Sequence, residues 1–211
     1  MVLPIRITSV MTAVPFYAQK YREQIASHLK KLSLEDRYLR FCNALKDEAI
    51  DAYVEKIDFE KDCAIVVYDV TANKDVFQRP IIGFLHIGPM DVKDECEFGI
   101  SVDAEFRNTG IASALFKHGL FYSQGHGYKT IYMNCLYENM AMRHIAKKNG
   151  LDTTSDFNEV TAKLKVDTSN QLESSFLEIT TNNFAIFDLA YRAKVHQIKE
   201  WLSLFAPLVP H

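Results

Sequence analysis

The chain has 211 residues, an apolar fraction of 48% and a formal net charge of −3. This length suits one domain, or one domain with an appendage, and the apolar fraction is enough for a well-filled core. The small negative charge creates no overall basic field, so we expect neither nucleic acid nor an anionic membrane as a partner. No apolar run approaches the ~18 residues of a membrane-spanning helix, and the first ten residues lack the apolar core of a secretory signal.

Hydrophobic periodicity predicts a helix-rich first third, then three strands, then a helix, a strand, a helix and a strand. The predicted helices are residues 15–32, 37–45, 47–57, 111–123 and 139–149, and the predicted strands are residues 5–10, 63–70, 81–87, 95–102, 129–136 and 160–166. This order predicts an α/β (α+β) domain over residues 1–166, in which helices flank a mixed central sheet.

The chain after this domain, residues 167–211, is predicted to be a helical C-terminal extension. Apolar residues recur at spacings of three and four from Phe184 to Phe205 and form one stripe of an amphipathic helix. Such a stripe must be buried. It packs on its own domain, forms a homodimer contact, or covers a neighbouring groove as a lid.

Four cysteines, Cys42, Cys63, Cys96 and Cys135, lie far apart and form no CxxC pair. This usage is typical of a reduced cytoplasmic protein with buried thiols and argues against a disulfide framework or a structural zinc site. No set of His, Asp and Cys has the spacing of metal ligands either. We therefore expect a cytoplasmic protein without a metal.

The most informative stretch is Cys96–Ala112, in which an alternating strand pattern leads through a turn directly into a helix. The first N–H groups of a helix have no partner within the helix, and the helix dipole favours negative charge there. Gly110 in the turn lets an oxygen approach the backbone without a Cβ in the way. The turn therefore predicts a phosphate site, with a plain strand-to-helix turn as the alternative.

Three segments together resemble the GNAT acetyltransferase superfamily. The sequence RNTGIA at 107–112 resembles its (Arg/Gln)-x-x-Gly-x-(Gly/Ala) loop, and the helix from Asn139 to Gly150-Leu151 resembles its second signature. Residues 33–41, SLEDRYLRF, are similar to the corresponding helical region in the GNAT domains of bacterial protein-lysine acetyltransferases. The resemblance covers about residues 1–166. It implies a GNAT-like fold and transfer of an acetyl group from acetyl-CoA to a primary amine, by direct attack in a ternary complex.

The resemblance also implies which residues hold acetyl-CoA. Backbone N–H groups of the loop are expected to bind the pyrophosphate; this set comprises Asn108, Thr109, Gly110, Ile111 and Ala112. Arg107 adds charge or serves the loop itself. The strand at 95–102 is expected to part from the next parallel strand, which frees backbone groups near Ser101 and Val102 for the pantetheine arm. Asn139 is expected to contact the cofactor, to cap its helix, or both.

A lysine amine, with a pKa near ~10.4, needs a base before it can attack. Alternation places Glu95, Glu97, Gly99 and Ser101 on one face of the strand. Glu97 lies ten residues before Arg107, where related domains carry a strand glutamate, so the resemblance implies that Glu97 is the catalytic base. A solvated surface carboxylate is the alternative, and Glu95 and then His86 are its rivals.

The sequence also departs from the family pattern. Many members have a tyrosine acid seven residues after the asparagine, where this chain has Ala146. Tyr132 is a candidate replacement, and Asn134 on the same strand is a candidate cleft residue. The departure leaves two alternatives open: a non-catalytic acyl-CoA-binding regulatory module and a GNAT-fold interaction protein. The acceptor is a protein lysine, a protein N-terminus or a small amine. The sequence does not distinguish these three, because acceptor grooves are built from loops and helices without a recognisable motif.

Overall fold

The computed structural model describes residues 10–12, 18–69 and 78–166, all within a compact unit that ends at Gln171. The predicted helical extension at 167–211 and most of the strand predicted at 5–10 lie outside the described residues. The domain boundary after residue 166 likewise stays a prediction. No helix in the described part of the chain is long and apolar enough to cross a membrane.

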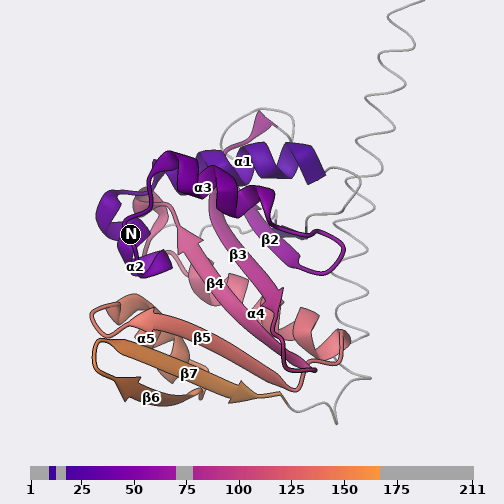
Figure 1. The fold of residues 1–211 in the computed structure, drawn as a ribbon, viewed down its shortest axis with the longest axis vertical. Helices are drawn as coiled ribbons and strands as arrows, with labels where there is room; N and C mark the ends of the chain where they lie inside the picture. Colours follow the sequence, from indigo (N-terminus) through magenta and orange to yellow (C-terminus); the bar gives the residue numbers. More distant parts are fainter. Residues whose placement is uncertain (1–9, 13–17, 70–77, 167–211) are drawn as a thin grey trace, which may run out of the picture. The chain divides into compact units, whose positions relative to one another are not determined.

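One mixed sheet forms the centre of the described structure (Figure 1). Its strands are β1 (Val10–Thr12), β2 (Cys63–Tyr68), β3 (Ile81–Pro89), β4 (Glu95–Val102), β5 (Thr130–Leu136), β6 (Asp152–Asp156) and β7 (Glu159–Lys165). They lie in the order β1-β2-β3-β4-β5-β7-β6. All neighbours are antiparallel except β4 and β5, which run parallel. The predicted mixed sheet is therefore confirmed.

Helices cover both faces of this sheet. They are α1 (Ala18–Lys31), α2 (Leu34–Phe41), α3 (Asp47–Glu55), α4 (Ile111–Gly125) and α5 (Met140–Lys148), with a 3-10 turn at Ala104–Phe106. Figure 1 shows α1 and α3 together on one side of β2 and β3, with α4 on the other side. All six residues of β2 are buried because both of its faces are covered.

Two apolar layers follow from this arrangement, one on each face. The layer under α4 and α5 is centred on Leu85, Phe98, Phe116 and Ile131. The layer under α1 and α3 is centred on Ile25, Leu29, Ile50 and Phe84. Because β4 is central, its alternate side chains point to opposite faces of the sheet. The face on which a β4 residue lies therefore determines its neighbours.

The predicted elements agree with the structure except at three places. Strand β1, Val10–Thr12, shares only Val10 with the strand predicted at 5–10. Ser33 accepts a hydrogen bond from the backbone N–H of Asp36 at 3.1 Å, so α2 begins at Leu34 rather than at the predicted Arg37. The helix ends at Phe41 because Cys42 has a left-handed backbone (φ +53°). Strand β6 was not predicted, since all five of its residues are exposed and its polar sequence shows no alternation.

Candidate active site

The two parallel strands at the centre of the sheet part midway along their length. β4 and β5 pair only over Glu95–Glu97 and Thr130–Tyr132. Beyond these residues β4 stays paired with β3 through Val102, and β5 stays paired with β7 through Leu136. Figure 1 shows the two strands beginning side by side and spreading apart toward α2. This is the parting that the family resemblance predicts.

The register decides which backbone groups face this opening. The N–H of Asp103 donates to the carbonyl of Ile82 at 2.9 Å, on the β3 side. Successive residues of a strand direct their backbone groups to opposite neighbours, so Ser101 pairs with β3 while Ile100 and Val102 point toward β5. Within the described residues, β5 offers them no ladder partner. Ile100 and Val102, rather than Ser101, therefore present free backbone donors and acceptors.

A cavity of about 600 Å³ lies at this opening. Its walls are the end of β4, the loop that leads into α4, the first half of α5, and one side of α2. The predicted cofactor residues that line it are Ser101, Val102, Arg107, Asn108, Gly110, Ile111, Ala112 and Asn139. Thr109 does not line it. Its hydroxyl donates to the carbonyl of Phe106 at 2.5 Å and closes the loop on itself.

The loop end of the cavity, residues 108–113, has the properties of an anion site. Asn108 (φ +59°) and Gly110 (φ +92°) both adopt left-handed backbone, and a Cβ added at Gly110 would meet no atom within 4 Å. No side chain caps α4, in contrast to α2 and α5, which Ser33 and Asn139 cap. The first-turn donors of α4 therefore remain available to an anion in the cavity.

Two side chains of this region tie α2 to the rest of the site. Arg107 forms an ion pair of 2.5 Å with Asp36, whose pKa is held below its usual range by hydrogen bonds from Ser33 and Arg107 that outweigh its desolvation. Asn139 accepts from the N–H of Met142 at 3.1 Å and donates to the carbonyl of Leu39 at 3.1 Å. Arg107 thus serves the architecture of the cavity, and Asn139 is a helix cap that also lines the cavity.

Ser101 is held by a histidine that sequence reasoning did not identify. His28 of α1 lies 2.9 Å from the Ser101 hydroxyl through Nε2 and 3.0 Å from the Ile81 carbonyl through Nδ1. A carbonyl only accepts, so Nδ1 carries the proton and Nε2 accepts from Ser101. Burial lowers the pKa of His28 to about 4, so the ring stays neutral at physiological pH. The Ser101 hydroxyl therefore donates its hydrogen bond to His28 in the core.

The predicted base, Glu97, lies at the last paired position of β4, where the two strands part. Its side chain is exposed and does not line the cavity. Asn134 of β5 donates to its carboxylate at 3.0 Å, and Thr161 of β7 in turn donates to Asn134 at 3.0 Å. The structure thus joins Glu97 and Asn134 in one polar row on the uncovered part of the sheet.

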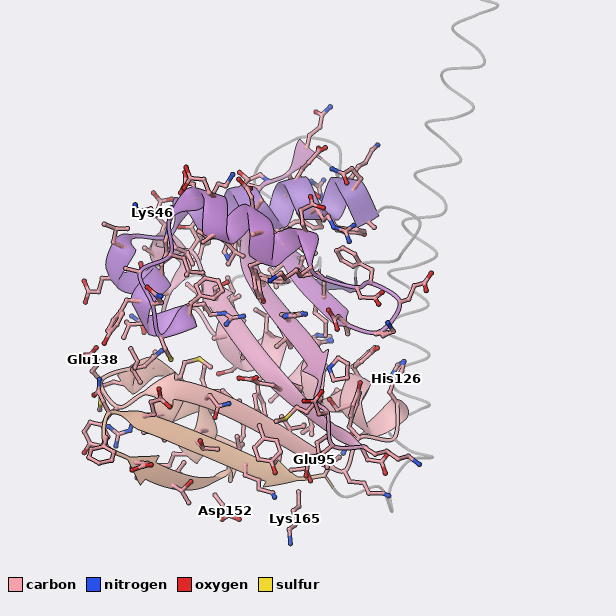
Figure 2. The ribbon with its side chains drawn as sticks, viewed as in Figure 1. Lys46, Glu95, His126, Glu138, Asp152 and Lys165 are labelled. Carbon is pink, nitrogen blue, oxygen red and sulfur yellow. The ribbon has the colours of Figure 1, made fainter. Side chains whose placement is uncertain are left out.

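The rival base Glu95 accepts from the Tyr132 hydroxyl at 3.3 Å. Figure 2 shows Glu95 at the start of β4, the end of the strand farther from α2. Neither Glu95 nor Tyr132 lines the cavity. The structure therefore brings these two predicted candidates together: Tyr132 lies opposite Glu97 at the last paired position of the two strands, whereas Glu95 lies two residues nearer the start of β4.

The second rival, His86 of β3, lies directly opposite Gly99, and its two ring nitrogens contact Tyr53 and Asp62. Its Nδ1 is 2.8 Å from the Tyr53 hydroxyl, and its Nε2 is 3.3 Å from the carboxylate of Asp62. Burial raises the pKa of Tyr53, so the phenol keeps its proton. His86 is thus oriented by Asp62 and Tyr53 and does not itself line the cavity.

The position at which many family members carry the tyrosine acid belongs to the hydrophobic core of this protein. Ala146 is buried in the apolar layer under α5 and does not line the cavity. The cavity residues that sequence reasoning missed come from α2 and from the inner side of α5. They include Asp36, Arg40, Met142 and His144. All four lie in segments with a family resemblance, Asp36 and Arg40 within residues 33–41 and Met142 and His144 in the helix that begins at Asn139, but the resemblance implied a role for none of the four.

Metal ligation has no support in the part of the chain that the structure describes, where no group of three His, Cys, Asp or Glu side chains is placed to hold an ion. All four cysteines are free. Cys63, Cys96 and Cys135 are buried, as predicted, and burial raises the pKa of Cys96 to about 11. Cys42, at the end of α2, is exposed instead.

Comparison with known proteins gives a family and a fold. The model of the Acetyltransferase (GNAT) family matches residues 27–151, whereas curated proteins give no significant match. The GNAT domain of S. lividans PAT is 18% identical with a TM-score of 0.57, over 74% of this chain and 89% of that one. A GNAT-family acetyltransferase from Streptococcus pneumoniae is 15% identical with a TM-score of 0.54, over 75% and 100%.

A ribosomal-protein-alanine N-acetyltransferase from Brucella melitensis is similar at 10% identity, with a TM-score of 0.54 over 74% of this chain and 99% of that one. At such identities the structural likeness concerns the fold alone. The family model covers more than half of the chain, including the parted strands and the loop at the start of α4. The chain therefore belongs to the GNAT family of acetyltransferases.

Proposed function

We propose that this protein transfers an acetyl group from acetyl-CoA to a primary amine by direct attack in a ternary complex. The observation that carries the proposal is the cavity between the parted strands, which runs to the uncapped start of α4. Acetyl-CoA supplies an activated thioester and a pyrophosphate. The cavity offers a place for an extended chain and, at its end, donors for an anion.

The residues present fit this ligand. First-turn N–H groups of α4 and the loop around Gly110 would hold the pyrophosphate, because they have no intrahelical partner and no side chain caps them. The free backbone groups of Ile100 and Val102 would pair with the amides of the pantetheine arm. A backbone N–H aimed at a carbonyl oxygen that gains negative charge is worth about 3 kcal/mol.

Glu97 is the base in this proposal. It lies where β4 and β5 part, and its carboxylate is exposed and held by Asn134, so it can take a proton from an incoming amine directly or through one water. Its position outside the cavity suits a group that acts on the acceptor and not on the acetyl donor. The acceptor itself is a protein lysine, a protein N-terminus or a small amine.

A second candidate function is a non-catalytic acyl-CoA-binding module, and the burial of Ala146 favours it. Two measurements separate the candidates. Isothermal titration with acetyl-CoA tests binding, and release of CoA thiol over a panel of amines tests turnover. Binding with turnover supports the transferase, binding without turnover supports the module, and the absence of binding contradicts both.

A further inference from the structure

Arg40, in the last turn of α2, lines the cavity and lies against β4. Its guanidinium occupies the space beside Gly99. A Cβ added at Gly99 would be 2.0 Å from Nη2, 2.4 Å from Cζ and 2.7 Å from Nη1 of Arg40. Gly99 lies between Glu97, the last paired residue, and Ile100, which faces the opening. Arg40 is therefore held where the two strands part.

The guanidinium of Arg40 is poorly satisfied. Nη2 donates to the Tyr53 hydroxyl at 3.4 Å, at the long end of the hydrogen-bond range, and Cζ lies 4.8 Å from the centre of the Phe41 ring. Nε is buried without a hydrogen-bond partner. A guanidinium carries five N–H donors, and buried donors are normally paired. Arg40 thus has donors to spare at the cavity wall.

Three other arginines of the domain have carboxylate partners, whereas Arg143 donates to the Tyr137 carbonyl. Arg22 lies 3.6 Å from Glu55, Arg37 lies 2.8 Å from Asp47, and Arg107 lies 2.5 Å from Asp36.

Among the described residues, no carboxylate lies within 4.0 Å of the nitrogens of Arg40, and the nearby Glu97 is bound by Asn134 instead. Because Asp36 and Arg107 neutralise each other, Arg40 leaves the cavity wall with an unbalanced positive charge.

We propose that Arg40 binds a carboxylate carried by the substrate where it lines the cavity beside Gly99. The inference rests on the proposed acyl transfer from a CoA thioester and deepens it by naming the chemistry of the substrate. Arginine pairs with a carboxylate through two parallel hydrogen bonds, which gives both affinity and orientation. The carboxylate belongs either to a dicarboxylic acyl group on CoA or to the acceptor amine.

The experiment uses the full-length chain and compares matched ligand pairs. Titrations with acetyl-CoA and succinyl-CoA probe the acyl group. Thiol release with amino acids and with their amides probes the acceptor. We expect the wild type to prefer the carboxylate member of one pair at least tenfold. A preference in the first pair assigns the carboxylate to the acyl group, and a preference in the second assigns it to the acceptor.

Three variants test whether Arg40 is the cause. Arg40→Gln should reduce the preference to within about twofold. Gly99→Ala should reduce it without removing a charge, because the new Cβ displaces the guanidinium, and this variant serves if Arg40→Gln is unstable. Arg143→Gln removes an arginine of α5 that does not line the cavity, and it should keep the wild-type preference.

The inference is wrong if the wild type binds acetyl-CoA but shows no preference in either pair, or if Arg40→Gln and Gly99→Ala both keep the preference. In that case the proposed function still stands. If the wild type binds neither thioester, the proposed function fails, and titration with succinate decides the inference alone. The ¹⁵N signal of the side-chain Nε–H that Arg40→Gln removes should then shift with succinate, and an unmoved signal overturns the inference.

Discussion

The two ends of the cavity are built in different ways. The loop end consists of consecutive residues, 108–113, at the start of one helix. The α2 side consists of residues that are distant in sequence: Arg40 lies over Gly99, and Asp36 reaches Arg107. The comparison teaches that the free donors of a helix terminus are a local property, whereas the position of a side chain such as Arg40 at the cavity wall is decided by long-range packing.

Two contacts join these parts and fix the cavity between them. The Arg107–Asp36 ion pair connects the loop end to the start of α2. The hydrogen bond from Asn139 to the Leu39 carbonyl connects α5 to the end of α2. Helix α2 is thus held at both of its ends, across the gap between β4 and β5. Substitutions at the loop end should therefore change the binding of acetyl-CoA, and substitution of Glu97 should change turnover.

The largest effect is expected on the acceptor side. Glu97→Gln keeps the size of the side chain but removes its proton affinity, so turnover should fall by about 10² to 10⁴. Because Glu97 does not line the cavity, the dissociation constant of acetyl-CoA should stay within about twofold of the wild type. Steady-state thiol release and calorimetry measure the two quantities.

Glu95→Gln is the matched control for this variant, since it removes a carboxylate from the same face of the same strand. It should keep most of the activity because Glu95 lies away from the parting of the strands. If Glu97→Gln is fully active and Glu95→Gln is not, the roles of the two residues are exchanged. If both are active, neither is the base.

The next effect concerns the pH dependence of stability. The pKa of His28 is about 4 in the folded state and about 6.5 in the unfolded state, so the unfolded chain takes up the proton first as the pH falls. The contribution of the neutral His28 ring to the free energy of unfolding is fully present above pH 6.5 and is lost as the pH falls toward 4. The loss amounts to about 3 kcal/mol. Urea unfolding between pH 7 and pH 4 measures it.

His28→Gln should flatten this part of the stability curve. His126→Gln, which changes an exposed histidine at the end of α4, is the matched control for the loss of an imidazole. Equal slopes for the wild type and His28→Gln would show that His28 takes up its proton at the same pH in the folded and the unfolded chain, which would contradict the lowered pKa.

The third effect concerns the loop end alone. Saturation with acetyl-CoA at ~100 times its dissociation constant should stabilise the wild type by about 2.7 kcal/mol, which raises the melting temperature by several degrees. Gly110→Asp should abolish this rise, because its carboxylate would occupy and repel the phosphate site.

Gly127→Asp is the matched control. Gly127 also has a left-handed backbone (φ +79°) with no atom within 4 Å of an added Cβ, so it shares the strain of the substitution but does not line the cavity. It should lower the melting temperature and keep the rise with ligand. A Gly110→Asp protein that acetyl-CoA still stabilises fully would place the pyrophosphate elsewhere.

The smallest effect is expected from the contact that joins the two ends. Arg107→Gln and Asp36→Asn should each weaken acetyl-CoA binding by about 1 kcal/mol or less, because the Arg107 side chain is partly exposed and the pair is screened. The double variant should be no weaker than either single one if the residues act together. Additive losses would mean instead that Arg107 contacts the cofactor directly.

The comparison between prediction and structure follows the same division. The loop at 107–112, the cap at Asn139 and the bounds of β4 were predictable, because each depends on neighbours within a few residues. The pairing of His28 with Ser101 spans 73 positions and leaves no periodic signal. Arg40 lay inside a predicted helix, and nothing in its local sequence distinguished it from Arg37, which is buried and paired.

The sequence by itself determined that a strand runs through a glycine turn into a helix, because the alternation of β4, the freedom of Gly110 and the periodicity of α4 are local properties. Only the tertiary structure decided which groups meet at the opening. Strand register directs Ile100 and Val102 into the gap and turns Ser101 toward His28. The packing of α2 across the parted strands carries Arg40 to Gly99. These arrangements depend on contacts between elements, and no stretch of sequence encodes such contacts alone.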